Sequence, residues 1–203
     1  MNAALHQRSY PARVQYLLLK WRTQASLVFG LQRAARESLD RILTLWPGDA
    51  YALGSRAHAA AQANDRAAAI ADYRSLLATN PGHSHGWFNL GFLLEQQGEL
   101  DDARVALQRA VEIEPKLDRA WYGLGLVAIR QHRFDDAVSA LKRNTELQPM
   151  SPHGWYQLAR VQMDRHQPDE ALKIIRHLRG FEPKVAAQLE RETGLLSAPG
   201  AER

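Results

Sequence analysis

The sequence contains no cysteine, so the chain has neither a disulfide nor a thiolate ligand for a metal. It also has no apolar run long enough to cross a bilayer or to form a signal peptide, because the apolar stretch 16–19 ends at Lys20. Patterns for zinc hydrolases, phosphate-binding loops, dinucleotide sites and serine nucleophiles are missing as well. We therefore expect a cytoplasmic protein with no catalytic residue, no metal and no cofactor.

Acidic residues are scarce at the start of the chain. The 203 residues include 26 Lys or Arg and 22 Asp or Glu, a net charge of +4. Residues 1–49 hold seven of the basic residues against Glu37, Asp40 and Asp49, so residues 50–203 hold nineteen of each sign. The basic start can meet an acidic protein, nucleic acid or anionic lipid, or be solvated helix surface. Nucleic acid is disfavoured because its phosphates need a basic stripe along the whole chain.

Proline is uncommon, yet five of the nine prolines recur every 34 residues. They are Pro47, Pro81, Pro115, Pro149 and Pro183. An alanine lies twelve residues before each of them, at Ala35, Ala69, Ala103, Ala137 and Ala171. A fixed period of this length indicates one helical hairpin that is copied and stacked. The sequence therefore predicts an all-α solenoid.

The clearest repeat covers residues 84–117. Apolar residues at helical spacing predict a first helix over 85–97, which Gly98 ends because glycine reaches positive φ without strain. The pair Asp101–Asp102 then opens a second helix, where carboxylates oppose the positive end of the helix dipole. Pro115 stops this second helix.

A motif Trp-x-x-Leu-Gly, a later alanine and leucine, and a closing proline are spread over each unit. One unit has Trp87, Leu90, Gly91, Ala103, Leu107 and Pro115, and the next has Trp121, Leu124, Gly125, Ala137, Leu141 and Pro149. At a period of 34 this pattern resembles the tetratricopeptide repeat (TPR). The resemblance covers about 16–183, and its first two units deviate from the motif as terminal repeats do.

The resemblance implies a right-handed superhelical solenoid of antiparallel helix pairs with a C-terminal capping helix. The expected divisions are an extension 1–15, repeat units near 16–49, 50–83, 84–117, 118–151 and 152–185, a capping helix 184–194 and a disordered tail 195–203. Small residues such as Gly91 and Gly125 are expected where the two helices of a pair approach closely. Asn144 stands where an alanine is usual, and we expect either a hydrogen bond to a neighbouring helix end or local loosening.

In proteins of this kind the first helices line a concave groove. The residues expected on that face are Tyr51, His58, His85, Phe88, Asn89, Phe92, Arg119, Tyr122, Leu126, Arg130, His153, Tyr156, Arg160 and Asp164. Aromatic anchors among arginines suit a protein or peptide segment that carries apolar side chains and some acidic residues. The alternative is that packing between first helices buries Phe88 and Phe92 as additional core.

One TPR subclass holds a peptide carboxylate with Lys, Asn, Asn, Lys and Arg. The matching positions here are Gly54, His58, Asn89, Arg119 and Gly123. Since only Asn89 and Arg119 fit, a carboxylate clamp of that kind is disfavoured, and Asn89 is expected to bond a partner backbone.

Two further patterns invite a chemical reading that the repeat makes unnecessary. His132 and His166 occupy one turn position in successive units, and without cysteine or a zinc motif we interpret them as polar turn residues. Asp101–Asp102 and Asp135–Asp136 resemble paired catalytic carboxylates, but they recur at the start of second helices, where capping explains them.

The helix expected near 14–31 has an apolar surface without a preceding repeat to cover it. Its apolar residues are Val14, Leu17, Leu18, Trp21, Ala25, Val28 and Phe29. Residues 1–13 can seal this surface, a second copy can dock on it in a homodimer, or it can lie on a membrane with basic residues toward lipid phosphates.

We expect a non-catalytic bacterial scaffold or adaptor, similar to a co-chaperone, that binds a protein segment in its groove. The alternative is a structural protein that self-assembles through 14–31 and the helix 184–194, or that assembles on a membrane surface. An enzyme is the least supported class.

Overall fold

The described part of the chain is all-α, as the repeat predicts. A computed structural model describes residues 11–195, which form eleven α-helices and no strand. The residues before and after this range, including most of the expected extension and tail, lie outside the description. These helices belong to two compact units that divide between Pro81 and Gly82, and each unit is described by itself.

No helix within residues 11–195 is both long and apolar enough to pass through a bilayer.

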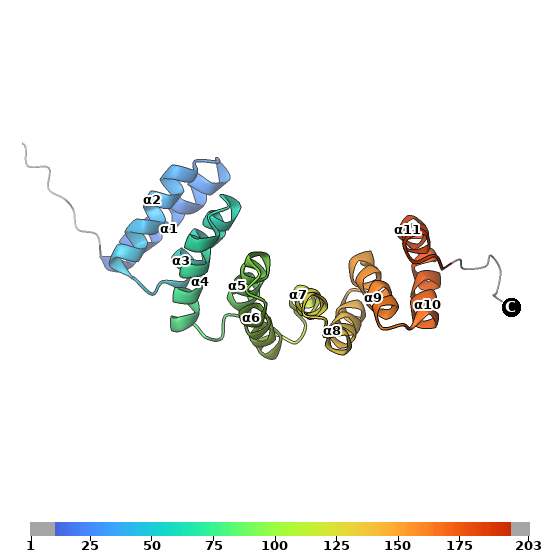
Figure 1. The fold of residues 1–203 in the computed structure, drawn as a ribbon. Helices are drawn as coiled ribbons and strands as arrows, with labels where there is room; N and C mark the ends of the chain where they lie inside the picture. The colour runs from blue at the N-terminus through green and yellow to red at the C-terminus, as the bar shows by residue number, and fades with distance from the viewer. Residues whose placement is uncertain (1–10, 196–203) are drawn as a thin grey trace, which may run out of the picture. The chain divides into compact units, whose positions relative to one another are not determined.

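Unit 1 consists of two helical pairs, drawn from blue to teal in Figure 1. Each first helix packs on the second helix of its pair, and α2 also packs on α3. The helices are α1 (Ala12–Val28), α2 (Gln32–Leu45), α3 (Ala50–Gln62) and α4 (Arg66–Thr79). The first helix thus begins at Ala12, inside the expected extension.

Unit 2 consists of three helical pairs and a final helix, drawn from green to red in Figure 1. Each second helix packs on the first helix of the next pair, which produces the stacked order. The helices are α5 (Ser84–Gln97), α6 (Leu100–Ile113), α7 (Asp118–Arg130), α8 (Phe134–Leu147), α9 (Pro152–Asp164), α10 (Pro168–Arg179) and α11 (Pro183–Thr193).

Glycine permits the close approach of the two helices in a pair. A Cβ atom on Gly91 would lie 2.7 Å from Cγ of Leu107, and one on Gly125 would lie 2.7 Å from Cγ of Leu141. Both leucines are almost completely buried. Because these distances are shorter than van der Waals contact, an added methyl group would force the leucines to shift, and the close approach of the helices agrees with the small residues expected here.

The turn inside each hairpin contains one residue with positive φ. Gly30, Asn64, Gly98, His132 and His166 have φ values between 55° and 85° and follow one another at the repeat period. Gly98 ends its helix in this conformation as predicted. The two histidines are turn residues as predicted, and their shared left-handed backbone shows why this position favours glycine or asparagine.

Asp101 and Asp135 do not cap their helices through a side-chain hydrogen bond, which corrects the capping role that the sequence suggested. The N-cap residues of α6 and α8 are Glu99 and Arg133, and neither helix has a side-chain cap bond. The aspartates lie in the first turn instead, beyond the cap itself, where they still oppose the helix dipole. They also bond the next hairpin: Asp101 accepts from Gln131 at 2.9 Å, and Asp135 pairs with Arg165 at 2.7 Å.

The C-terminal part of unit 2 has a continuous apolar core that α11 closes. Ala186 and Leu189 of α11 are completely buried in a cluster with Leu158, Ile175 and other residues of α7 to α10. The one polar substitution that the sequence singled out is accommodated, because Nδ2 of Asn144 donates to the carbonyl of Asp118 at 2.9 Å. The hydrogen bond to a helix end is thus formed.

Candidate functional site

The first helices of unit 2 form a connected face. α7 contacts both α5 and α9, and α9 contacts α11. This connectivity brings Phe88 and Phe92 of α5, Tyr122 of α7 and Tyr156 of α9 onto successive neighbouring helices. The four aromatic residues predicted as anchors therefore belong to one unit.

An aromatic pair with a cation lies on α5. The rings of Phe88 and Phe92 are stacked with their centroids 6.3 Å apart and an interplanar angle of 26°. Phe88 is half-buried, whereas Phe92 is 49% exposed. The guanidinium of Arg119 on α7 lies 5.1 Å from the centroid of Phe88, within the range of a cation–π contact. Packing between first helices thus covers part of Phe88 but leaves Phe92 available.

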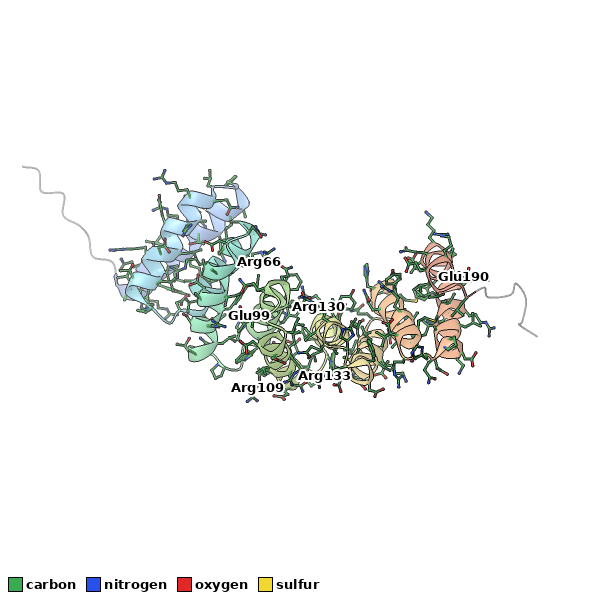
Figure 2. All side chains as sticks on the ribbon, viewed as in Figure 1. Arg66, Glu99, Arg109, Arg130, Arg133 and Glu190 are labelled. Atoms are coloured by element: carbon green, nitrogen blue, oxygen red, sulfur yellow. The ribbon has the colours of Figure 1, made fainter. Side chains whose placement is uncertain are left out.

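An ion pair closes one end of this face. Nη1 of Arg130 donates to the backbone carbonyl of Glu95 at 2.6 Å and to its Oε1 at 2.5 Å, which links α7 to α5. Figure 2 labels Arg130 beside α7 and Arg109 beside α6. Because Arg130 has a carboxylate partner within the chain, the face has fewer free cations than the sequence suggests.

The other end of the face meets the capping helix. The hydroxyl of Tyr156 donates to Oε2 of Glu192 on α11 at 2.7 Å, and the guanidinium of Arg160 lies 5.7 Å from the Tyr156 ring. The hydrogen bond to Glu192 and burial raise the pKa of Tyr156 above its ordinary value. These residues line a hollow of about 460 Å³ together with Met163, Asp164 and Thr193. The hydroxyl of Tyr156 is therefore already bonded to α11.

The remaining predicted residues of unit 2 lie on the same three helices, α5, α7 and α9. His85 and His153 are exposed, while Asn89, Tyr122 and Leu126 are half-buried. Nδ1 of His85 lies 3.5 Å from Oε2 of Glu114. Within residues 11–195 no group of three or more histidine or acidic side chains is arranged to hold a metal ion.

Unit 1 carries the other two predicted residues, Tyr51 and His58. Both lie on α3, where Tyr51 is half-buried beneath Lys20 and His58 is exposed. The ammonium of Lys20 is 4.7 Å from the Tyr51 centroid, and burial is the main reason that the pKa of Tyr51 is raised.

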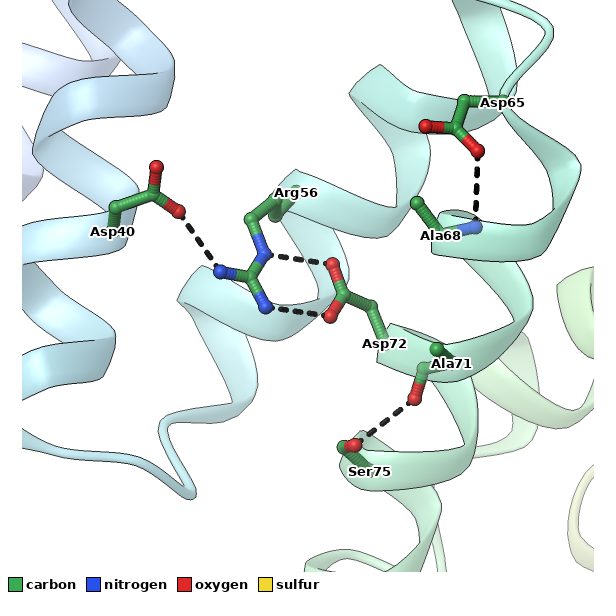
Figure 3. Close-up of polar contacts among 7 residues, drawn as sticks. All are labelled: Asp40, Arg56, Asp65, Ala68, Ala71, Asp72 and Ser75. Carbon is green, nitrogen blue, oxygen red and sulfur yellow. Dashed lines mark hydrogen bonds and ion pairs between the residues drawn. The ribbon is translucent and has the colours of Figure 1, made fainter.

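A three-helix ion network in unit 1 was not apparent from the sequence. Arg56 of α3 forms a two-bond fork with Asp72 of α4, with Nε–Oδ2 at 2.8 Å and Nη2–Oδ1 at 2.7 Å (Figure 3). Its Nη1 donates to Oδ1 of Asp40 on α2 at 2.8 Å. Hydrogen bonding to Asp72 is the largest cause that raises the pKa of Arg56. The signal in the sequence was an arginine at a position that is leucine in the later repeats.

The apolar surface predicted on the first helix is exposed. Leu17, Leu18, Trp21, Val28 and Phe29 are all solvent-accessible, and the last three are 69%, 81% and 77% exposed. The residues of α1 that are fully buried are polar, Thr23 and Ser26.

Comparison with known proteins agrees with this geometry. Two family models described as tetratricopeptide repeat match residues 60–126 and 122–180. No curated protein sequence matches the chain. Among solved structures, the MamA protein is similar with a TM-score of 0.76 and 19% identity, over 91% of this chain and 98% of that one.

Two further solved structures have the same fold. MamA from Desulfovibrio magneticus RS-1 has a TM-score of 0.74 and 21% identity, over 88% of this chain and 96% of its own. YrrB, described as a TPR protein with an unusual peptide-binding site, has a TM-score of 0.75 and 18% identity, over 83% and 88%. The matched repeats, the hairpins with their glycine contacts and the shared fold lead to one conclusion: the chain belongs to the tetratricopeptide repeat family.

Proposed function

We propose that the protein is a scaffold whose unit 2 binds a protein segment on the face of α5, α7 and α9. The TPR fold supports an interaction role, and TPR proteins are generally non-catalytic. YrrB, similar in fold, is described as having a peptide-binding site. The specific binding face and the chemistry of its partner are our proposal.

The exposure of Phe92 carries the proposal. Among the described residues of unit 2, it is the only phenylalanine or tryptophan that is exposed to this degree. Leaving such a ring in water costs about 1.5–3 kcal/mol relative to burial, so an exposed aromatic on a rigid helix is a good anchor for a partner. The stacked Phe88 holds the ring in place.

The charges around Phe92 indicate which segment would fit. Arg119 lies on the Phe88 ring and keeps its polar edge for an acceptor, whereas Arg130 is neutralised by Glu95. We therefore expect an apolar side chain against Phe92 with an acidic residue on the side of Arg119. Arg160 and Met163 border the hollow beside α11, which can take a further side chain of the same segment.

Affinity capture from native lysate tests the proposal with a matched pair of double variants. Phe92→Ala with Tyr122→Ala removes the anchors, and Val105→Ala with Ile113→Ala removes exposed apolar side chains from α6 on the second-helix layer. We expect the first variant to lose the captured protein at unchanged helicity and the second to retain it. Equal capture by wild type and the first variant would contradict the proposal.

A further inference from the structure

The outward face of α1 has an unusual composition. Val14, Leu17, Leu18, Trp21 and Val28 are exposed and, at 100° per residue, share one side of the helix. The opposite side packs Tyr16 and Leu19 against the core and buries Thr23 and Ser26. A surface helix normally turns a polar side to water, whereas α1 is apolar on its outward side as well as on its packed side.

The later repeats show how the corresponding helix face packs when another hairpin precedes it. Leu18 corresponds by the repeat period to Ala52 and Gly154. Ala52 is buried in a cluster with Leu39 and Ile42 of the preceding helix α2. At Gly154, even a Cβ atom would collide with Oδ1 of Asn144 on α8. Leucine is thus too large for another hairpin packed in the same way, and the occupant of this face is of a different kind.

The apolar surface continues onto the turn between α1 and α2. Val28, the last residue of α1, and Phe29 and Leu31 in the turn are all exposed. The matching turns of later hairpins are polar, with Asn64–Asp65, Glu99, His132–Arg133 and His166–Gln167. Turn residues are ordinarily polar because turns face water. An apolar ridge therefore runs along α1 and around its end.

The ridge has basic margins and no acidic ones. Residues 1–36 contain six Lys or Arg and no Asp or Glu. On α1, Arg13 and Arg22 flank the apolar side on opposite edges by helical position, and Arg22 has only a long contact of 3.8 Å with Glu37. Lys20 lies over Tyr51 and is not part of the margin.

We infer that α1 and its turn bind the surface of an anionic lipid bilayer. Trp, Phe and aliphatic side chains on one face with arginine at its edges form an interfacial helix, whose rings enter the lipid and whose guanidinium groups bind phosphates. A second copy fits less well, because two α1 faces would bring their arginines together and α1 itself has no acidic residue to pair them. End-to-end stacking on α11 fits poorly too, since its exposed residues are mostly polar: Lys184, Gln188, Arg191 and Glu192.

Sedimentation with vesicles tests this inference on the full chain. The vesicles contain phosphatidylcholine alone or with about one third phosphatidylglycerol, and binding is measured at low and high salt. We expect binding only to the anionic vesicles, weakened by salt because lipid attraction is screened. Phe29→Asp should weaken binding by at least about tenfold. Met150→Asp, at an exposed apolar residue in a turn of unit 2, is the matched control and should bind as wild type does.

The arginine margin is tested in the same assay. Arg13→Gln with Arg22→Gln should weaken anionic binding, while Arg109→Gln with Arg143→Gln on the second helices should not. Circular dichroism confirms that each variant is folded. The inference is overturned if wild type does not bind anionic vesicles, or if Phe29→Asp binds as well as Met150→Asp. It is also overturned if light scattering shows a dimer that Phe29→Asp dissociates and that binds no vesicles.

Discussion

Removing one partner of the Arg56–Asp72 ion pair in unit 1 should destabilise the protein more than replacing both partners with apolar residues. Arg56, Asp72 and Asp40 join three helices, and the side chain of Asp72 is only 11% exposed. In Asp72→Ala, Arg56 loses its two-bond fork and remains two-thirds buried with a single carboxylate at its edge. We expect this variant to lose about 2 kcal/mol of unfolding free energy, below the usual range for a fully buried pair because Arg56 is partly solvated.

The double variant Arg56→Leu with Asp72→Ala should restore most of that loss. The matching positions in unit 2 are Leu90 with Ala106, and both of these are buried. An apolar pair of this kind replaces a buried ion pair at little cost, so the double variant should lie within about 1 kcal/mol of wild type. Asp40→Ala, which removes a half-exposed carboxylate, should cost about 0.5–1 kcal/mol.

Native-state hydrogen exchange is the appropriate assay, because it reports the opening free energy of α3 and α4 separately from unit 2. Stacked repeats need not unfold as one unit, so a single melting temperature would mix the two. Arg56→Leu is also measured alone. If the losses of Arg56→Leu and Asp72→Ala simply add in the double variant, the two residues are not coupled, and the reasoning fails.

Three other perturbations follow from single contacts. His132→Gly should raise stability by about 1 kcal/mol in urea unfolding, because His132 occupies a left-handed backbone conformation. Gly154→Ala should lower it by about 1–3 kcal/mol, because the new methyl group displaces the buried Asn144. Glu192→Gln should lower the pKa of Tyr156 toward its ordinary value in an ultraviolet titration; in wild type the stabilisation that accompanies the raised pKa is lost as pH rises through it.

Each of these has a control within the chain. Gly98→His at the matching turn should lower the unfolding free energy, because it places a side chain in the same left-handed conformation. A Gly98→His variant as stable as wild type would contradict the backbone argument. Gly54→Ala meets only an ordinary contact with Leu76 at 3.8 Å and should be neutral or stabilising, and a loss equal to that of Gly154→Ala would remove the steric account. Lys184→Ala, at an exposed residue of α11, should leave the pKa of Tyr156 unchanged.

The sequence predicts the hairpins well because local residues determine them. Gly98 ends a helix by its own backbone freedom, and Gly91 fits one neighbouring leucine at a fixed place in the repeat. The turn position of His132 was also recognised, although its left-handed backbone became evident only when the period was followed from Gly30 onward.

The site is less predictable because its partners come from other hairpins. Whether Arg130 is a free cation depends on Glu95 of the preceding helical pair. Whether the Tyr156 hydroxyl is free for a partner depends on Glu192 of the capping helix. Such contacts rest on the packing angle between repeats, which a periodic motif does not specify. The apolar outward side of α1 was predictable, because Val14, Leu17, Leu18 and Trp21 recur at helical spacing.

Site-specific photo-crosslinking tests the central claim most directly. Benzoylphenylalanine replaces Phe92 on the proposed binding face or Val105 on α6, and the captured protein is exposed to light and identified by mass spectrometry. The account predicts a cross-link to one partner segment from position 92, competed by excess unlabelled protein, and none from position 105. A cross-link to the same partner from position 105 but not from position 92 would contradict it.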